Sequence, residues 1–160
     1  MSLTLAELLR IHAQPGQVDW IGLRRQRLDA LTPVTTALLT ASGLDGDHAR
    51  PGKRALTLIQ KEHLAVIAAL AGCDAIAPET LRRNIVVSGI NLTALRDNTL
   101  QLGGAVIKFT TLCAPCSRME KTLGTGGYNA MRGHGGWCAE VITEGHVTLG
   151  DTLTPLHVPP

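Results

Sequence analysis

The chain is poor in aromatic side chains: among 160 residues it has only Trp20, Phe109, Tyr128 and Trp137. A surface that stacks single-stranded nucleic acid needs several aromatic rings on one face, so this partner class is disfavoured. Charge of one sign is lacking too, because 15 Lys and Arg residues face 13 Asp and Glu residues for a net charge of +2. That balance gives no electrostatic support for duplex binding. We expect no nucleic-acid partner.

Long apolar runs are also missing. No segment approaches the roughly 18 residues of a membrane-spanning helix, and the first residues lack the basic segment and cleavage site of a secretory signal. We therefore expect a cytoplasmic chain with no membrane partner. Hydrophobic residues make up 44% and charged residues 18%, which is typical of a folded chain. The length predicts a single domain over residues 1–160.

The sequence contains no nucleotide-binding GxGxxG after a strand and no P-loop. It does contain four cysteines, which in a cytoplasmic chain are expected to be thiols and not a disulfide framework. They are Cys73, Cys113, Cys116 and Cys138. These thiols are therefore the first candidates for a chemical role.

Helices are expected at two places. Thr4 and Glu7 have capping-box spacing, which predicts a helix over about residues 4–12. Apolar residues at helical spacing, followed by Gly72, predict a helix over 61–71. In between, the run 18–27 resembles a strand. We interpret its arginines, Arg24, Arg25 and Arg27, as a solvated strand face, with an anion site as the alternative.

Short strands dominate the second half. The glycine pair 103–104 predicts a hairpin between strands 100–102 and 105–112, and Glu144-Gly145 predicts another between 138–143 and 146–149. Further strands are expected over 54–59 and 85–87. Short strands with close turns and a few helices indicate a mainly β, barrel-like domain.

Cys116 is the strongest chemical candidate. Ser117 and Glu120 have capping-box spacing, so a helix should begin at Ser117 with Cys116 just before it. There the helix dipole and the nearby cations Arg118 and Lys121 favour thiolate over thiol. Three alternatives stay open: buried structural thiols, a Cys113-x-x-Cys116 redox pair, and a zinc site completed by His134 and Cys138.

A glycine-rich segment follows this cysteine. Six glycines lie within residues 124–136, which is poor material for a helix or a strand. Backbone amides of such a loop can approach a ligand, and Arg132 and His134 could hold phosphate or an oxyanion. A mobile loop is the alternative.

Several short motifs occur in a fixed order along the chain: Gly43-Leu44-Asp45-Gly46-Asp47, Arg54 to Gln60, Arg83 to Gly89, Leu102-Gly103, Pro115-Cys116, Gly133-His134-Gly135-Gly136 and Val147 to Asp151. Together they resemble the MOSC domain, named for the C-terminal domain of molybdenum-cofactor sulfurase, over about residues 18–153. The resemblance implies a closed β-barrel core of mostly antiparallel strands. It also implies a cysteine that binds sulfur or ligates molybdenum, which is Cys116 in this sequence.

The resemblance implies two functions, since some relatives reduce N-hydroxylated small molecules with molybdenum cofactor and others are proposed sulfur carriers. As a reductase, the chain would use Cys116 as the molybdenum ligand and take electrons from a partner protein, because no iron–sulfur or flavin motif is present. Candidate contacts to the cofactor are Arg54, Arg82, Arg83, Arg118, Arg132, His134, Gly126, Gly127 and Asn129.

As a carrier, Cys116 would accept a persulfide from a cysteine desulfurase and deliver it to cofactor or metal–sulfur assembly. A non-catalytic structural zinc domain is the second alternative. Whether the chain is an enzyme depends on which hypothesis holds. The role of Cys113 is left open.

Overall fold

A computed structural model describes residues 2–156; residue 1 and residues 157–160, the ends of the expected 1–160 domain, lie outside the described residues. The first half of the chain contains α1 (Leu5–Leu8), β1 (Gly16–Leu23), β2 (Thr32–Val34), β3 (Thr36–Thr40), β4 (Gly43–Leu44), β5 (Leu56–Gln60), α2 (Lys61–Ala71) and the 3-10 helix η1 (Pro78–Leu81). The second half contains β6 (Ile85–Ser88), the 3-10 helix η2 (Leu92–Leu95), β7 (Thr99–Leu102), β8 (Ala105–Leu112), α3 (Ser117–Leu123), α4 (Gly127–Met131), β9 (Trp137–Thr143), β10 (Gly145–Thr148) and β11 (Thr152–Pro155).

The main sheet closes into a barrel. Its order is β11-β7-β8-β9-β5-β6-β1, and β11 pairs again with β1 through Gly16 opposite Leu153. The pair β5–β6 is parallel and the other pairs within this barrel are antiparallel. The expected mainly β fold with a closed, mostly antiparallel barrel is confirmed. Strand β2 extends β1 at the edge, and β10, β3 and β4 form a second, smaller sheet.

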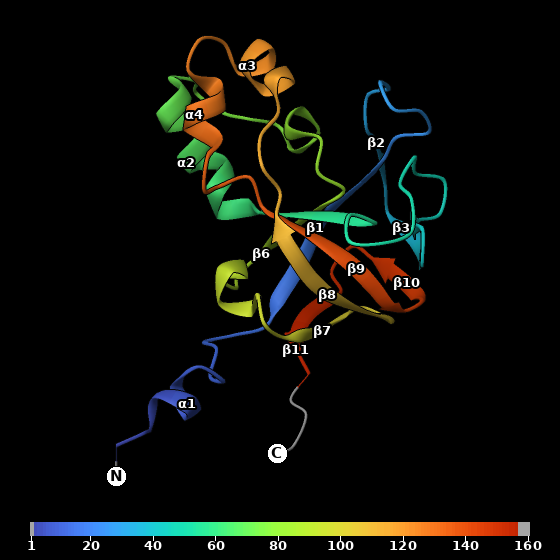
Figure 1. The fold of residues 1–160 in the computed structure, drawn as a ribbon, viewed down its shortest axis with the longest axis vertical. Coiled ribbons are helices and arrows are strands. Elements are labelled where there is room, and N and C mark those ends of the chain that lie inside the picture. Colours follow the sequence, from blue (N-terminus) through green and yellow to red (C-terminus); the bar gives the residue numbers. More distant parts are fainter. Residues whose placement is uncertain (1, 157–160) are drawn as a thin grey trace.

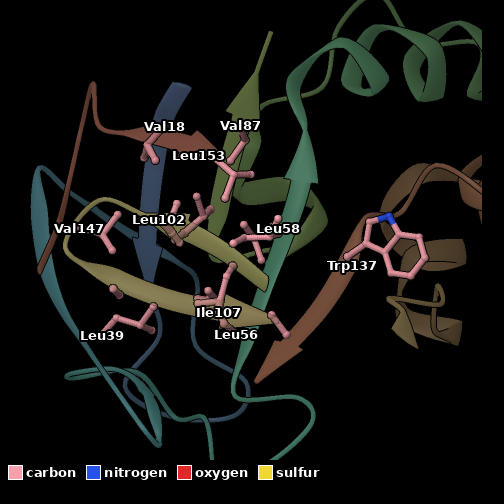
Figure 2. Packing of buried hydrophobic residues seen from close by; sticks show 14 of the residues in the cluster. Val18, Leu39, Leu56, Leu58, Val87, Leu102, Ile107, Trp137, Val147 and Leu153 are labelled. Atoms are coloured by element: carbon pink, nitrogen blue, oxygen red, sulfur yellow. The ribbon is translucent and has the colours of Figure 1, made fainter. Parts of the chain in front are cut away.

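The barrel interior is filled by aliphatic side chains from alternate strand positions. In Figure 2, residues such as Leu58, Val87 and Ile107 point toward one another from different strands, whereas Trp137 lies apart from them. In β5, Leu56 and Leu58 belong to this interior cluster, while Ile59 belongs to a second cluster. Strand β5 therefore buries both of its faces, the inner one in the barrel and the outer one beneath helices.

The second cluster joins the barrel to its helices. It contains Ile59, Val86, Leu64, Ile67, Leu81, Met119 and Met131, which come from β5, β6, α2, η1, α3 and α4. Figure 1 shows α2, α3 and α4 gathered at one end of the barrel, with α1 toward the opposite end. No helix within residues 2–156 combines the length and apolarity needed to cross a membrane. The helices α2, α3 and α4 thus cover the outer face of the barrel at one end.

Of three local elements predicted from the sequence, two have the expected extent and the third is shorter. Helix α2 has the expected bounds and ends at Gly72, whose φ of 73° is left-handed. Helix α1 begins at the expected Thr4–Glu7 capping box but ends at Leu8, because its leucines are exposed and have no core to pack against. The hairpin between β7 and β8 is confirmed, with Leu102 opposite Ala105.

The hairpin expected around Glu144-Gly145 is wrong. Both strands exist, but β10 pairs with β3, placing His146 opposite Leu38. The reason is that β9 already has β8 on one edge and β5 on the other, so it offers no free edge to β10. Turn residues such as Glu144-Gly145 predict where the chain reverses, but not which strand pairs with the strand that follows the turn.

Candidate functional site

A polar cavity of about 220 Å³ lies at the end of the barrel beside α3. Beside it β1 ends and β6 begins, and β8 ends and β9 begins. The first residues of β6 and β9, Ile85 and Trp137, both pair with Leu58 of β5. We call this cavity the arginine pocket. Its charged lining consists of Arg24, Arg54, Arg82, Arg83 and Arg118. Its thiol lining consists of Cys113, Cys116 and Cys138.

The pocket faces the outside of the barrel. Cys138 lies between Trp137 and Ala139 in β9, and both of these neighbours belong to the interior cluster. Thr57 likewise lies between the interior residues Leu56 and Leu58. Since successive strand residues point to opposite faces, Cys138 and Thr57 point outward, into the pocket beneath α3.

Arg24 corrects one prediction. The expected strand 18–27 ends at Leu23, because the Arg24 backbone is held by the loop that follows β4: its N–H donates to Asp47 Oδ1 at 2.8 Å, and its carbonyl accepts from His48 N–H at 2.7 Å. Arg25 and Arg27 are exposed, whereas Arg24 is half-buried and lines the pocket. The Nε of Arg24 is buried without a hydrogen-bond partner. The solvated-face interpretation is therefore wrong for Arg24.

Arg83 is a structural member of the pocket. It is 7% exposed and donates to the carbonyls of Gly135 at 2.8 Å, Leu81 at 2.9 Å and Cys113 at 3.2 Å. These bonds join the start of β6 to the segment after β8 and to the loop before β9. Arg83 thereby fixes the backbone of Cys113, and three of its five N–H donors are already used.

Asn84 stabilises the same corner. Its Oδ1 accepts from the hydroxyl of Thr57 at 3.0 Å, and its Nδ2 donates to the carbonyl of Gly22 at 3.2 Å. The side chain is 3% exposed, so these bonds replace water. Through these bonds Asn84 connects β1 and β5 at the point in the chain directly after Arg82 and Arg83.

Arg82 adopts an unusual backbone conformation. Its φ of 61° makes it the one non-glycine residue with positive φ among residues 2–156. Burial lowers the pKa of Arg82, the cations Arg24 and Arg118 lower it further, and Cys116 and Asp29 oppose this. The cations of the pocket thus repel one another. None of the ion pairs found in the described part of the chain involves a pocket arginine.

Cys113 and Cys138 form a thiol pair inside the pocket. A hydrogen bond from Cys138 lowers the pKa of Cys113 to about 6, with help from Arg83, Arg54 and Arg24 and against the opposing effect of burial. The same hydrogen bond and burial raise the pKa of Cys138. The hydrogen bond therefore favours the thiolate form at Cys113 and the thiol form at Cys138.

Cys116 lies where the sequence places it, with one difference. Helix α3 begins at Ser117, and Cys116 itself is the N-cap. The expected Ser117–Glu120 capping box is wrong, because the Glu120 carboxylate accepts from the backbone N–H of Gly126 at 2.7 Å and of Tyr128 at 2.8 Å. These two bonds lower the pKa of Glu120. Cys116 is exposed at the pocket mouth, near the N-terminal end of α3.

The glycine-rich segment is not the open loop that its composition suggests. Residues Gly127–Met131 form α4, and the Gly126 amide is occupied by Glu120 instead of being offered to a ligand. Gly127, Gly126 and Asn129 do not line the arginine pocket. Gly136 has a φ of 89°, and a Cβ there would collide with the carbonyl of Leu58. The closing glycines therefore permit close packing against β5.

A neighbouring groove of about 290 Å³ shares Cys113 with the arginine pocket. Its lining includes Pro115, Tyr128 and Arg132, with glycines of the 133–136 segment. Arg132 donates to Asn129 Oδ1 at 3.4 Å and is exposed. Arg132 thus belongs to this groove and not to the arginine pocket. Of the other sequence-predicted contacts, four line the arginine pocket: Arg54, Arg82, Arg83 and Arg118. The remaining four line neither cavity: Gly126, Gly127, Asn129 and His134.

The ring of His134 packs edge-on against the ring of His63, at a centroid distance of 5.2 Å. Burial lowers the pKa of His63, and His134 lowers it further, with Glu62 opposing. Within residues 2–156 no group of three or more His, Cys, Asp or Glu side chains is arranged to hold a metal ion. The zinc alternative built on Cys113, Cys116, His134 and Cys138 therefore finds no support in the geometry.

Sequence reasoning identified Cys116 and four of the five pocket arginines, but it missed the role of Cys138. A signal was present: the alternation of Trp137 and Ala139 as interior residues turns Cys138 to the outer face. What the sequence could not show is that β8 and β9 pair so as to bring Cys138 beside Cys113.

The comparison with protein families is decisive for classification. The model of the MOSC domain matches residues 37–154. The chain belongs to the MOSC domain family. This family is associated with molybdenum-cofactor binding. A search of curated proteins returned no match.

Solved structures support the MOSC fold of this chain. The YuaD protein of Bacillus subtilis superimposes with a TM-score of 0.76 at 18% identity, covering 89% of this chain and 97% of YuaD. YiiM from Escherichia coli gives a TM-score of 0.73 at 21% identity, covering 91% and 71% of the two chains. YiiM from Geobacillus stearothermophilus gives 0.73 at 16% identity, covering 89% and 76%. At these identities the likeness concerns the fold.

Proposed function

We propose that this MOSC protein binds molybdenum cofactor and reduces N-hydroxylated or related small molecules. The observation that carries the proposal is the arginine pocket, which combines five guanidinium groups with cysteine sulfur and has no carboxylate in its lining. Such a lining fits a cofactor that carries a phosphate and a metal with sulfur ligands. The buried, unpartnered Nε of Arg24 supports the same fit, since a buried donor gains from an added acceptor.

The position of each pocket residue indicates the role it would have in binding the cofactor. Arg24, Arg54, Arg82 and Arg118 would hold the phosphate through charge-assisted hydrogen bonds. Arg83 would position Cys113 and the pocket floor, because its donors already bond backbone carbonyls. Cys116, at the pocket mouth, would provide the thiolate ligand to molybdenum. When bound, the cofactor supplies two-electron chemistry that reduces an N–O bond to N–H and water.

The groove beside Cys113 would receive the substrate. It opens next to the pocket and offers Tyr128 as a flat wall and Arg132 as a cation. The electrons would come from a donor protein. The proposal includes a cytoplasmic location, where a reducing environment keeps the four cysteines as thiols.

The test is metal and pterin content after expression in a host that makes the cofactor, with anaerobic purification. Wild type should contain molybdenum and pterin, and Cys116→Ser should lose molybdenum. Cys73→Ser is the matched control, because Cys73 lies after α2 and outside the pocket, and it should load like wild type. An empty wild type, or Cys116→Ser loaded like wild type, would contradict the proposal.

A sulfur carrier is the second candidate function, and the exposure of Cys116 favours it. A thiol at the first turn of α3 with Arg118 beside it is accessible to a cysteine desulfurase and to an acceptor protein. Incubation with a desulfurase and cysteine should add one sulfur to Cys116, measured by mass spectrometry. An unlabelled Cys116 that still reacts with an alkylating reagent counts against this candidate.

A further inference from the structure

Cys113 is a pocket thiol that the proposed reductase does not use as a metal ligand. Its N–H donates to the carbonyl of Gly136 at 2.8 Å, and its carbonyl accepts from Arg83 at 3.2 Å. The backbone on both sides of the side chain is therefore fixed. The thiol is half-buried at the wall between the arginine pocket and the neighbouring groove, with the Cys138 thiol as hydrogen-bond donor.

The pocket carries positive charge that its own lining does not neutralise. Burial lowers the pKa of Arg82, and the neighbouring cations Arg24 and Arg118 lower it further. No ion pair of a pocket arginine is found among residues 2–156. Arg82 is also held in a left-handed conformation, a strain that persists in proteins mostly at functional sites. A small anion of more than one charge would relieve this repulsion.

The size of the cavity limits the choice of anion. Its 220 Å³ is several times the roughly 30 Å³ that one water molecule occupies in the liquid, which suits a small tetrahedral oxyanion. Because a nucleophilic sulfur lies in the same wall, an oxyanion carrying its own transferable sulfur would be held beside a group able to remove it.

We propose that the arginine pocket binds a small sulfur oxyanion of the thiosulfate type and that Cys113 accepts its terminal sulfur as a persulfide. The Cys113 thiolate attacks the outer sulfur of thiosulfate, a new S–S bond forms, and the S–S bond of thiosulfate breaks. The electron pair of that bond leaves with sulfite. One thiolate and one thiosulfate dianion thus give one persulfide anion and one sulfite dianion, with no other oxidant or reductant required.

The surrounding residues have defined roles in this step. The guanidinium groups of Arg24 and Arg54 hold the oxyanion and the departing sulfite. The hydrogen bond from the Cys138 thiol lowers the pKa of Cys113 and so favours the thiolate that attacks. Arg83 acts as a positioning residue through the Cys113 carbonyl.

This activity goes beyond the proposed reductase, since it needs neither molybdenum nor Cys116. Like the sulfur-carrier candidate, it forms a cysteine persulfide. The sulfur donor is thiosulfate instead of a cysteine desulfurase, and the receiving residue is Cys113 instead of Cys116. Its failure is therefore separable from the failure of cofactor binding. Because both ligands use the same arginines, cofactor phosphate and thiosulfate should exclude each other.

The test uses the full, reduced, cofactor-free chain incubated with thiosulfate. Wild type should gain one sulfur and release one sulfite, and fragment spectra should assign the sulfur to Cys113. Sulfate serves as a control anion without a transferable sulfur, and inorganic phosphate should slow the transfer. Cys113→Ser should lose both signals, whereas Cys73→Ser should keep both.

A folding check accompanies each variant, measured as the melting temperature by circular dichroism. Arg54→Gln provides a second variant with an intact Cys113; it should transfer sulfur more slowly at low thiosulfate and recover at high thiosulfate. Absence of sulfur transfer by folded wild type overturns the proposal. Sulfur found on Cys116, or transfer retained by Cys113→Ser, overturns it equally.

Discussion

At the scale of single residues, the chemistry of the pocket depends on which cysteine is ionised. Helix position and nearby cations predict Cys116, but in the folded chain the hydrogen bond from Cys138 and the guanidinium groups of Arg83, Arg54 and Arg24 act on Cys113. The Cys116 thiol is exposed, whereas Cys113 is the thiol whose pKa is lowered. The two thiols of the Cys113-x-x-Cys116 segment therefore differ in the chemistry open to them.

Alkylation of Cys113 should follow an unusually low pH. Because only the thiolate reacts, the fraction of reactive Cys113 rises as the pH rises through its pKa of about 6, instead of through about 8.5 as for an ordinary thiol. The measurement is the iodoacetamide rate at Cys113 against pH, mapped by mass spectrometry. Cys138→Ala should move the midpoint upward, because the donor to the thiolate is gone. A wild-type midpoint near 8.5 contradicts this account.

Replacement of Arg82 should separate stability from anion binding. Asn tolerates the left-handed conformation better than Arg, so Arg82→Asn should be as stable as wild type or more stable by up to about 1 kcal/mol. It should lose part of the rise in melting temperature that phosphate causes in wild type. Arg96→Asn is the control, because Arg96 is exposed outside the pocket and pairs with Asp97. Equal phosphate effects in wild type and Arg82→Asn would show that Arg82 holds no anion.

At the scale of elements, the pocket depends on close packing between the segment before β9 and the strand β5. Gly135 and Gly136 make this packing possible, because a side chain on Gly135 would meet the Cys113 carbonyl and one on Gly136 would meet the Leu58 carbonyl. Both glycines line the neighbouring groove, where the absence of a side chain allows the backbone segments to approach each other closely.

Two glycine substitutions test this packing. Gly136→Ala combines a positive φ with a backbone collision and should reduce the free energy of unfolding by about 3 kcal/mol or more. Gly133→Ala also has a positive φ, of 82°, but open space around it, so its cost should be about 1–2 kcal/mol. Urea unfolding of the two variants gives the comparison. Equal losses would mean that contact with Leu58 has no part in the effect.

Helices and hairpins that depend on neighbouring residues can be predicted from the sequence, whereas the pairing of strands distant in sequence cannot. Helix α2 follows from its apolar spacing and Gly72, and the β7–β8 hairpin follows from Gly103-Gly104. The partner of β10 does not follow, because both edges of β9 are taken by strands distant in sequence. Glu120 illustrates the same limit at the site, since its amide partners in the Gly126–Tyr128 segment are set by the packing of α4 against α3.

At the scale of the whole molecule, barrel closure brings the pocket together. The pocket-lining residues are widely spaced along the chain, and they meet because the ends of β1 and β8 and the starts of β6 and β9 come together around the middle of β5. The helices α2, α3 and α4 gather at one end of the barrel, as Figure 1 shows. A MOSC barrel thus presents cations and thiols on its outer face beneath a helical cover, while its interior stays apolar.

Binding of molybdenum by Cys116 in the arginine pocket can be measured by X-ray absorption at the molybdenum edge. Wild type and Cys116→Ser would be loaded with cofactor and compared under the same conditions. We expect one more sulfur neighbour of molybdenum in wild type than in Cys116→Ser, with Cys73→Ser identical to wild type. The same sulfur count in wild type and Cys116→Ser would contradict it.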